Sequence, residues 1–281
     1  MGTLLGGIGI AHTPTMGHAF DGRDGIPFME RWQQWFDGLA PVKRWIADQA
    51  PTHVVVIYND HLNYFDLTTY PTFAIGMSDF FPQADEGWGT RPFPGMGGDT
   101  AFSATVAESL IGDGFDLTFC QALEIDHGIY SWLPCLFDAP WPVKFLPIAV
   151  NMVMQPVPTP ARLHALGAAI RGGIAETADD SRVLFISTGG MSHQIHGSRF
   201  GLTNPTFDRY FLDKIAHECD TLLDTPMSRI MEIAGTEAAE LAMWYAMRGA
   251  LSDDIREAYS FHIRPEITGC GVIVLEETPA E

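Results

Sequence analysis

Basic residues are scarce in this chain of 281 residues. Sixteen Lys and Arg stand against thirty-five Asp and Glu, which gives a net charge of −19 with His neutral. Such a charge opposes nucleic acid or an anionic membrane as the principal partner, because both repel an acidic protein. Charged residues make up only 18% of the chain and hydrophobic residues 46%, so the chain can bury a substantial core.

Long apolar runs and paired cysteines are missing as well. No run approaches the ~18 residues of a membrane span, so no membrane association is expected. The N-terminal segment lacks the basic region and cleavage site of a secretory signal, which favours a cytoplasmic protein. The four cysteines are scattered without a CxxC pair, so the sequence indicates reduced, buried thiols and excludes the patterns of zinc knuckles and disulfide frameworks.

Short apolar runs alternate with stretches of helical spacing. The runs expected to be buried strands are 4–10, 53–58, 143–150, 182–187 and 271–275, and the expected helices are 29–49, 100–111, 160–178, 207–223 and 237–251. This alternation predicts an α/β fold, with a largely parallel or mixed central sheet covered by helices on both faces. No repeat or linker divides residues 1–281, so we expect one domain. The Gly- and Pro-rich segment 80–99 is too long for an ordinary connection and indicates a functional loop or lid.

Three of the predicted strands are each followed by a histidine, namely His12, His61 and His193. Ligands of open α/β sheets bind beyond the carboxyl ends of the strands, so we expect these side chains at one edge of the sheet. A fourth histidine, His127, follows an expected strand around 119–125. Neutral imidazole suits Zn, Cu, Fe and Ni, and the pattern therefore predicts a metal or proton-transfer site.

A carboxylate is needed beside two histidines to form the facial site typical of non-haem Fe(II) oxygenases. Glu240 is the best candidate, because its neighbours at helical spacing are Met243, Trp244 and Met247 and a carboxylate on such an apolar face needs a partner or a metal. Glu237 is explained without a metal, since Thr236 is a plausible N-cap and an acid is favourable in the first turn of a helix. The spacing alone leaves His193, His196 and His127 all open as a third ligand.

Rival catalytic motifs are weak. Segment 187–190 lacks the GxSxG nucleophile elbow, and the glycines at 6–9 do not open a helix as a dinucleotide fingerprint requires. The HxxH at 193–196 lacks the HExxH pattern of zinc proteases. These patterns leave the histidine and glutamate set as the main candidate site.

At these residues the sequence resembles the protocatechuate 4,5-dioxygenase β-subunit family of class III extradiol dioxygenases. The motifs that carry the resemblance are IAHTP, YNDH, PTFAIG, DEGWGTRPFP, DHG, TGGMSHQ and GTEAAELAMWYAMRGAL, which together cover most of the chain. The resemblance implies a single catalytic domain with a mononuclear Fe(II) site that opens a catecholic ring with O2. It implies that His12, His61 and Glu240 bind the iron and that His193 is the acid/base residue. His127 then contacts a substrate hydroxyl or oxygen.

Two departures from the family pattern bear on partners and substrate. The family covers its site with a small α-subunit to which no segment here corresponds, so we expect a homo-oligomer or a complex with a small α-type subunit. Near the last strand Glu266 stands where the family presents small polar residues to a substrate carboxylate, which predicts repulsion of that carboxylate unless Arg264 turns inward. The alternatives are a zinc-dependent hydrolase on the same His/His/Glu site and a binding module that has lost the reaction.

Overall fold

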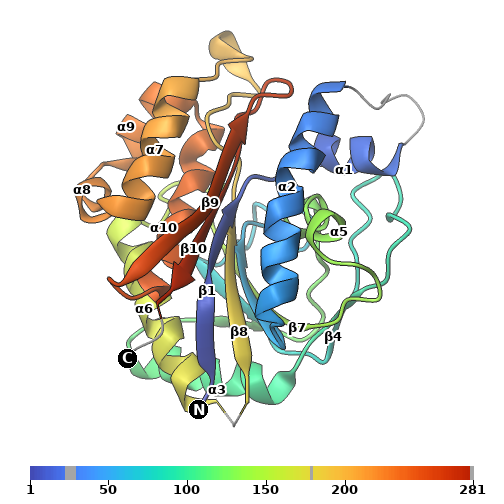
Figure 1. Ribbon diagram of the computed structural model, residues 1–281, viewed down its shortest axis with the longest axis vertical. Coiled ribbons are helices and arrows are strands. Elements are labelled where there is room, and N and C mark those ends of the chain that lie inside the picture. The colour runs from blue at the N-terminus through green and yellow to red at the C-terminus, as the bar shows by residue number, and fades with distance from the viewer. Residues whose placement is uncertain (23–29, 178–179, 279–281) are drawn as a thin grey trace.

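An eight-stranded mixed sheet forms the middle of the molecule (Figure 1). The structure is a computed structural model and describes residues 1–22, 30–177 and 180–278. The strands of this sheet, in chain order, are β1 (Thr3–Ile10), β2 (His53–Tyr58), β3 (Phe73–Gly76), β6 (Thr118–Cys120), β7 (Lys144–Val150), β8 (Arg182–Thr188), β9 (Ile255–Ile263) and β10 (Cys270–Glu277). Across the sheet they follow the order β6-β3-β7-β2-β8-β1-β10-β9. A separate small hairpin pairs β4 (Phe80–Phe81) with β5 (Met96–Gly97).

Four neighbouring strands, β7, β2, β8 and β1, run parallel in the centre of the sheet. Their side chains are almost all buried, which is why these strands read as continuous apolar runs in the sequence. The strands that flank this core are antiparallel to it, because β3 pairs antiparallel with β7 and β10 pairs antiparallel with β1. The carboxyl ends of the four central strands therefore lie at one edge of the sheet.

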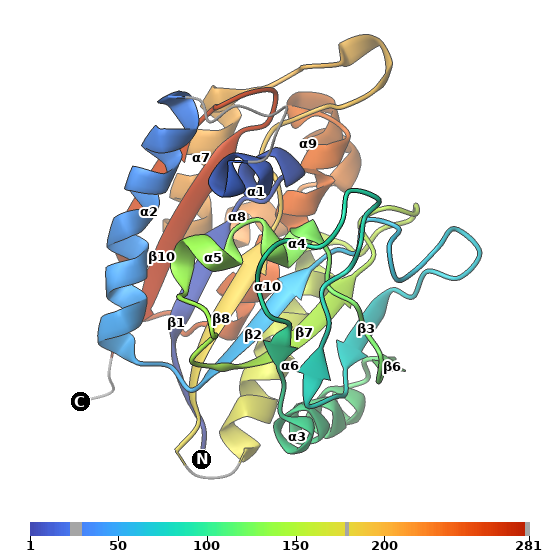
Figure 2. The same cartoon turned by 90° about the vertical axis from the view of Figure 1, so that its right-hand side faces the viewer.

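Helices cover both faces of the sheet (Figures 1 and 2). One face packs against α1 (Pro14–Asp21), α2 (Glu30–Gln49), α4 (His127–Tyr130) and α5 (Leu133–Leu136). The other face packs against α3 (Thr100–Gly112), α6 (Pro160–Glu176), α7 (Pro205–His217), α8 (Asp220–Leu223) and α10 (Trp244–Ala250). Helix α9 (Met227–Ala234) and the 3-10 helices η1 (Gly197–Arg199) and η2 (Glu237–Met243) lie near the carboxyl edge of the strands. None of the helices in the described part of the chain is long and apolar enough to cross a membrane.

Helices α6 and α10 cross at a point where neither has a side chain. A Cβ on Gly167 would lie 1.9 Å from the carbonyl oxygen of Ala246, and a Cβ on Gly249 would lie 2.0 Å from that of His164. The two backbones therefore approach closely enough to require glycine on both helices. This contact fixes α10, which begins directly after the segment that carries Glu240.

The predicted α/β fold is confirmed, with all five expected strands present. Several boundaries differ. The prediction of a strand over 119–125 is wrong beyond Cys120, where β6 ends. Within the rest of that range, Ile125 makes one isolated bridge, to Gln83. The single helix 207–223 is interrupted, because Glu218 leaves the helical backbone region between α7 and α8. Residues 29 and 178 of two predicted helices lie outside the described residues.

Candidate metal centre and active site

The edge formed by the central strands collects the histidines that follow them. His12 comes two residues after β1, His61 three residues after β2, and His193 five residues after β8. All three line a single cavity of about 570 Å³, together with His127 and Glu240. His127 arrives differently from the sequence expectation, because the first turn of α4 carries it rather than the end of a strand parallel to the others.

His12, His61 and Glu240 converge at the floor of this cavity. The Nε2 atoms of His12 and His61 are 3.2 Å apart, and the Glu240 carboxylate oxygens lie 3.2 Å from Nε2 of His12 and 3.4 Å from Nε2 of His61. Atoms with lone pairs approach this closely only when a proton or a cation lies between them. Two ligands at right angles with bonds of ~2.1 Å are roughly 3.0 Å apart, so these three donors fit a small transition-metal ion.

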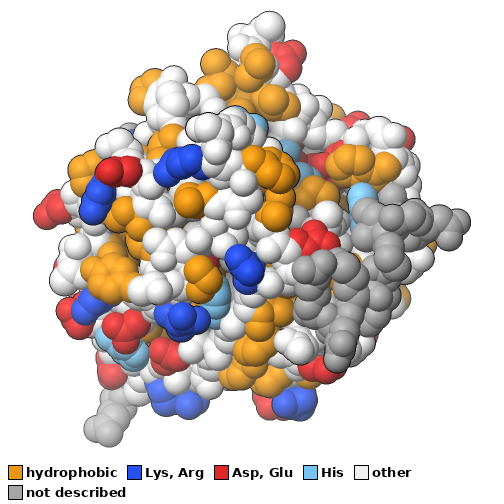
Figure 3. All heavy atoms as spheres, turned by 90° about the horizontal axis from the view of Figure 1, so that it is seen from above, with side chains coloured by type: hydrophobic (Ala, Val, Ile, Leu, Met, Phe, Trp, Pro, Cys, Tyr) orange, Lys and Arg blue, Asp and Glu red, His pale blue; other side chains and the backbone are white. Residues whose placement is uncertain are grey.

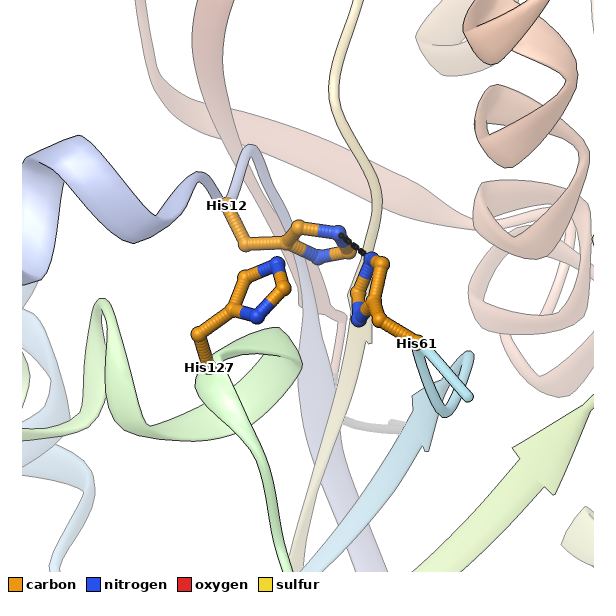
Figure 4. A group of neighbouring side chains, drawn as sticks. All are labelled: His12, His61 and His127. Atoms are coloured by element: carbon orange, nitrogen blue, oxygen red, sulfur yellow. Dashed lines mark hydrogen bonds between the residues drawn. The ribbon is translucent and has the colours of Figure 1, made fainter. Parts of the chain in front are cut away.

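His127 adds a third imidazole to the group. Its ring centroid lies 3.9 Å from that of His61 and 5.7 Å from that of His12, and Figure 4 shows the three rings pointing toward one another. The ring nitrogens of His12, His61 and His127 lie within 4.8 Å of one another, so these three could also hold an ion. His193 is not in that group, although it lines the same cavity and is buried.

In each of these four histidines, the Nδ1 atom has a hydrogen-bond partner within the protein. The Nδ1 atom of His12 lies 2.8 Å from Thr188 Oγ1, and that of His61 lies 2.9 Å from an Asp126 carboxylate oxygen. The Nδ1 atom of His193 lies 2.8 Å from the carbonyl oxygen of Met191. A carboxylate or a carbonyl only accepts hydrogen bonds, so His61 and His193 carry a proton on Nδ1. In the neutral ring the lone pair then sits on Nε2.

In His127 the hydrogen-bond partner of Nδ1 is the Glu86 carboxylate. One Glu86 oxygen lies 2.5 Å from Nδ1 of His127, and the other accepts a hydrogen bond of 2.9 Å from the backbone N–H of His127.

Charges at the floor of the cavity shift one another's pKa values. Burial lowers the pKa of His12, and the Glu240 carboxylate only partly opposes this. Burial would also lower the pKa of His61, but Asp126 and Glu240 outweigh it and hold that pKa well above its ordinary value. Burial raises the pKa of Glu240, yet His12 and His61 reverse this and keep the pKa well below its usual range. The site therefore holds carboxylate anions ready to balance a cation.

Two glycines in the TGGMSH motif make room for the site. A Cβ on Gly189 would lie 2.5 Å from the backbone oxygen of Glu240, and a Cβ on Gly190 would lie 2.5 Å from the ring of His193. Without a side chain, the backbone N–H of Gly190 comes close enough to donate a 2.8 Å hydrogen bond to a Glu240 carboxylate oxygen. The motif thus places His193 and Glu240 against the same short backbone segment.

Glu237 and Glu240 have different partners, and the local structure differs from the predicted helix with an N-cap. Residues 237–243 form the 3-10 helix η2, and Thr236 has helical backbone angles without capping it. The Glu237 carboxylate instead pairs with Nδ1 of His196 at 2.8 Å and accepts the backbone N–H of Ile195. Glu240 remains on the buried side, next to Met243 and Trp244.

The expectation for Glu266 is wrong. Its carboxylate accepts a 3.4 Å hydrogen bond from the indole N–H of Trp32, and the residue from this segment that lines the cavity is Thr268. Thr268 is held there by an antiparallel bridge to His193. Arg264 donates a hydrogen bond to Thr203 on the surface. Repulsion of a substrate carboxylate by Glu266 therefore has no support.

Sequence reasoning missed the partners that hold the site. Asp126 accepts hydrogen bonds from the backbone N–H groups of His61 and Gly128 as well as facing Nδ1 of His61. Asn59 donates toward Nε2 of His61 and to Glu240. Both residues stand beside a singled-out histidine in the chain, Asp126 directly before His127 and Asn59 two residues before His61, and that adjacency was the available signal.

The comparisons with known proteins agree on one family. The family described as catalytic LigB subunit of aromatic ring-opening dioxygenase matches residues 6–270. A gallate dioxygenase of Pseudomonas putida is 36% identical over 197 residues, which is 69% of this chain and 57% of that protein. A 2,3-dihydroxyphenylpropionate/2,3-dihydroxicinnamic acid 1,2-dioxygenase of Rhodococcus jostii is 34% identical over 58% of this chain and 50% of that protein.

Coverage differs among the relatives. The chain spans about half the length of the two relatives just named. A second 2,3-dihydroxyphenylpropionate/2,3-dihydroxicinnamic acid 1,2-dioxygenase, from Pseudomonas putida, is 27% identical over 86% of this chain and 88% of that protein. Among solved structures, the uncharacterized protein JW3007 of Escherichia coli K12 has a TM-score of 0.54 at 11% identity, covering 98% of this chain and 100% of that one. This last likeness concerns the fold alone.

Proposed function

The chain belongs to the family of catalytic LigB subunits of aromatic ring-opening dioxygenases, and on that premise we propose that it is an Fe(II)-dependent extradiol dioxygenase acting on a catecholic ring. One catechol and one O2 would give one ring-opened semialdehyde acid that retains both oxygen atoms, so the equation balances without a further reductant. The carbon–carbon bond that breaks lies beside a hydroxyl-bearing carbon. We place the activity in a single catalytic domain spanning residues 1–281.

The observation that carries this proposal is the convergence of two imidazole Nε2 atoms and one carboxylate within 3.4 Å of one another. His12, His61 and Glu240 would hold the Fe(II), since two histidines and one carboxylate leave the other coordination positions open. When bound there, Fe(II) supplies Lewis-acid binding of the two adjacent ring oxygens and the redox contact between the ring and O2. The protein supplies the geometry and the movement of protons.

His193 is assigned the role of general base. Its Nδ1–H donates to the Met191 carbonyl, so its Nε2 lone pair is free to accept a proton from a ring hydroxyl in the cavity. Histidine suits this role because its ordinary pKa lies near neutral pH. We assign His127 the second role, contact with a substrate hydroxyl or with oxygen, because its ring lies against that of His61 within the same cavity.

The upper part of the cavity suits an aromatic ring. Its walls include the apolar side chains of Met152, Val153, Ile195 and Met231, while His12, His61 and Glu240 converge at the floor. Sites of this size with a few converging polar groups are typical of small-molecule binding. A flat aromatic substrate and O2 are therefore the ligands we propose for this chain.

We further propose that the enzyme acts as a homo-oligomer or with a small α-type subunit. Ile195, which lines the cavity, is 53% exposed, and Phe200, five residues further along the chain, is 64% exposed. Figure 3 shows hydrophobic side chains gathered on this face beside histidine side chains. Exposed apolar patches next to a site are typical of protein–protein contacts. Light scattering of the active enzyme tests this, and a fully active monomer would contradict it.

The activity is tested by oxygen consumption after anaerobic loading with Fe(II). The substrates should be catechols with carboxylate, neutral and cationic substituents, and the expected result is Fe(II)-dependent uptake of one O2 per ring together with the visible absorbance of a semialdehyde product. Stoichiometric zinc in the purified protein and no Fe(II)-dependent uptake with any catechol would overturn the proposal in favour of the zinc hydrolase.

A further inference from the structure

Glu86 lies in the Gly- and Pro-rich segment between β4 and β5, and both oxygens of its carboxylate contact the same residue, His127. One oxygen lies 2.5 Å from Nδ1 of His127 and the other accepts its backbone N–H at 2.9 Å. Both side chains are mostly buried, at 14% and 13% exposure. From this geometry we infer that Glu86 is a positioning residue, which fixes the ring of His127 so that its Nε2 faces the metal centre.

The backbone around Glu86 is anchored to the segment that leads into His127. The N–H of Ala84 donates to the Ile125 carbonyl at 2.9 Å, and the N–H of Ile125 donates to the Pro82 carbonyl at 2.9 Å. These two bonds make a short parallel bridge that ends directly before the paired side chains. Glu86 and His127 therefore face each other as a consequence of backbone pairing.

Further along, a buried arginine fixes the same segment to the N-terminal part of the chain. Arg91 is 8% exposed and makes two 2.7 Å bonds to the Asp21 carboxylate, with a further bond to the carbonyl of Tyr130 in α4. A bidentate arginine–carboxylate pair has a defined geometry. The segment is thereby held at both sides of Glu86, which is why a residue on a long loop can position a ring.

The chemistry of the pair determines which nitrogen of His127 faces the metal centre. A carboxylate only accepts, so Nδ1 of His127 must donate to Glu86. The lone pair of the neutral ring then sits on Nε2, and the ring points toward His12 and His61 (Figure 4). Glu86 is absent from the residues that line the metal cavity, and its two carboxylate oxygens both bond to His127. An Asp126 oxygen also lies within 4.8 Å of the Glu86 carboxylate, without a hydrogen bond between them.

The kinetic experiment compares Glu86→Gln with Asp85→Asn. The amide of Gln can accept from only one of the two N–H groups and presents a donor to the other, so the ring loses its fixed orientation. Asp85 is an exposed carboxylate on the same segment whose oxygen accepts from the N–H groups of Gly87 and Gly89, and Asn keeps an acceptor there. We expect kcat to fall about 10- to 100-fold in Glu86→Gln, with unchanged iron content, and to stay unchanged in Asp85→Asn.

A double variant separates positioning from a general structural effect. If Glu86 acts through His127, adding Glu86→Gln to His127→Gln should change kcat by less than about 2-fold, because the group it orients is already gone. Losses that multiply in the double variant would overturn the inference.

A second measurement needs no activity, and it matters because the kinetic part rests on the proposed function. In metal-free protein labelled with 15N-histidine, at a pH at which the ring is neutral, His127 should show a proton on Nδ1 and none on Nε2, both in the natural sequence and in Asp85→Asn. Glu86→Ala should give a mixture of the two forms, with the signal assigned by its absence from His127→Gln. A neutral His127 ring in the natural sequence with its proton on Nε2 and none on Nδ1 would overturn the inference. If no catechol is consumed but the nitrogen pattern is as expected, the proposed function fails while the pairing of Glu86 with His127 stands.

Discussion

Glu237 and Glu240 are three residues apart, and their carboxylates lie in different surroundings. Glu240 faces His12 and His61 at the floor of the cavity, whereas Glu237 pairs with His196 near its mouth. This contrast makes the two glutamates a matched pair for testing the metal site.

The Glu240→Ala variant should therefore lose its metal while Glu237→Ala retains it. Removing a ligand should weaken binding by more than the roughly 10- to 100-fold that the loss of an outer-shell partner costs. Metal analysis after anaerobic loading and gel filtration measures this. The ligand assignment is wrong if the alanine at 240 keeps one iron per chain and the alanine at 237 does not.

Replacing His193 by Ala should separate catalysis from metal binding. Its Nδ1 is used on the Met191 carbonyl and it lies outside the group of ring nitrogens at the metal centre, so iron content should not change. Loss of a positioned base should lower kcat on the order of 100- to 10,000-fold. Normal turnover of the variant at neutral pH would remove His193 from the mechanism.

Residue patterns in the sequence singled out the histidines and Glu240, which line one cavity, but not the partners that hold them. The position of a histidine that follows an apolar run can be predicted, because the strand places the histidine at the carboxyl edge of the sheet. Glu86 is 41 positions away from His127 and Asp126 is 65 positions away from His61. Pairs like these depend on how loops pack, which local periodicity does not encode.

At the scale of elements, the crossing of α6 and α10 supports the segment that carries Glu240. Gly167 belongs to this crossing, whereas Gly172 in the same helix is exposed and a Cβ there would meet only Ser109 Oγ at 3.7 Å. The helix crossing therefore requires a glycine at position 167, whereas a side chain would fit at position 172.

We expect Gly167→Ala to lower the free energy of unfolding by about 1–3 kcal/mol, because the new methyl group collides with the backbone of α10. Gly172→Ala should raise it by about 0.5–1 kcal/mol, since alanine favours an exposed helix position and restricts the unfolded chain. Urea unfolding of both variants measures the difference. Equal effects of the two substitutions would contradict this account of the crossing.

The longer buried strands were predicted well, whereas short or partly exposed elements, including β3 and α9, were missed. The edge strand β9 was missed because its side chains are mostly partly exposed and include charged residues. The segment 80–99 was predicted as a loop, and it contains the two-residue strands β4 and β5, which are too short to leave a periodic signal. The 3-10 helix η2 packs against β8 and α9, and such contacts leave no signal in local periodicity.

For the molecule as a whole, the four cysteines offer a probe of folding. All four are buried and free. Burial raises the pKa of Cys120 to about 11 and those of Cys135 and Cys219 to about 12, and it also raises the pKa of Cys270. An unfolded thiol has a pKa of about 8.5. Above pH ~8.5 the four thiols therefore keep their protons in the folded state and release them in the unfolded state.

Because the folded pKa values are raised, their stabilising effect is complete below pH ~8.5 and is lost as the pH rises toward the folded values. Between pH 7.5 and 9.5 the free energy of unfolding should fall by about 1 kcal/mol for each thiol. Urea unfolding in the presence of a reductant at both pH values tests this. The fall should be smaller in Cys135→Ala, and an identical fall in that variant would show that other groups cause it.

The fold class, the edge that bears the site and the family could be predicted from the chain as a whole, since strand ends and motif order are global patterns. The full lining of the cavity could not, because side chains such as Thr268 reach it only after the sheet has formed.

The fixed Nδ1 partners of the four histidines also affect the entropy of binding. Immobilising a side chain when a ligand binds typically costs about 0.5–1.5 kcal/mol. Here Thr188, Asp126, Glu86 and the Met191 carbonyl restrict ring rotation as soon as the chain folds. An arriving metal ion or substrate then meets rings that have already lost this freedom, and its affinity is not reduced by having to order them.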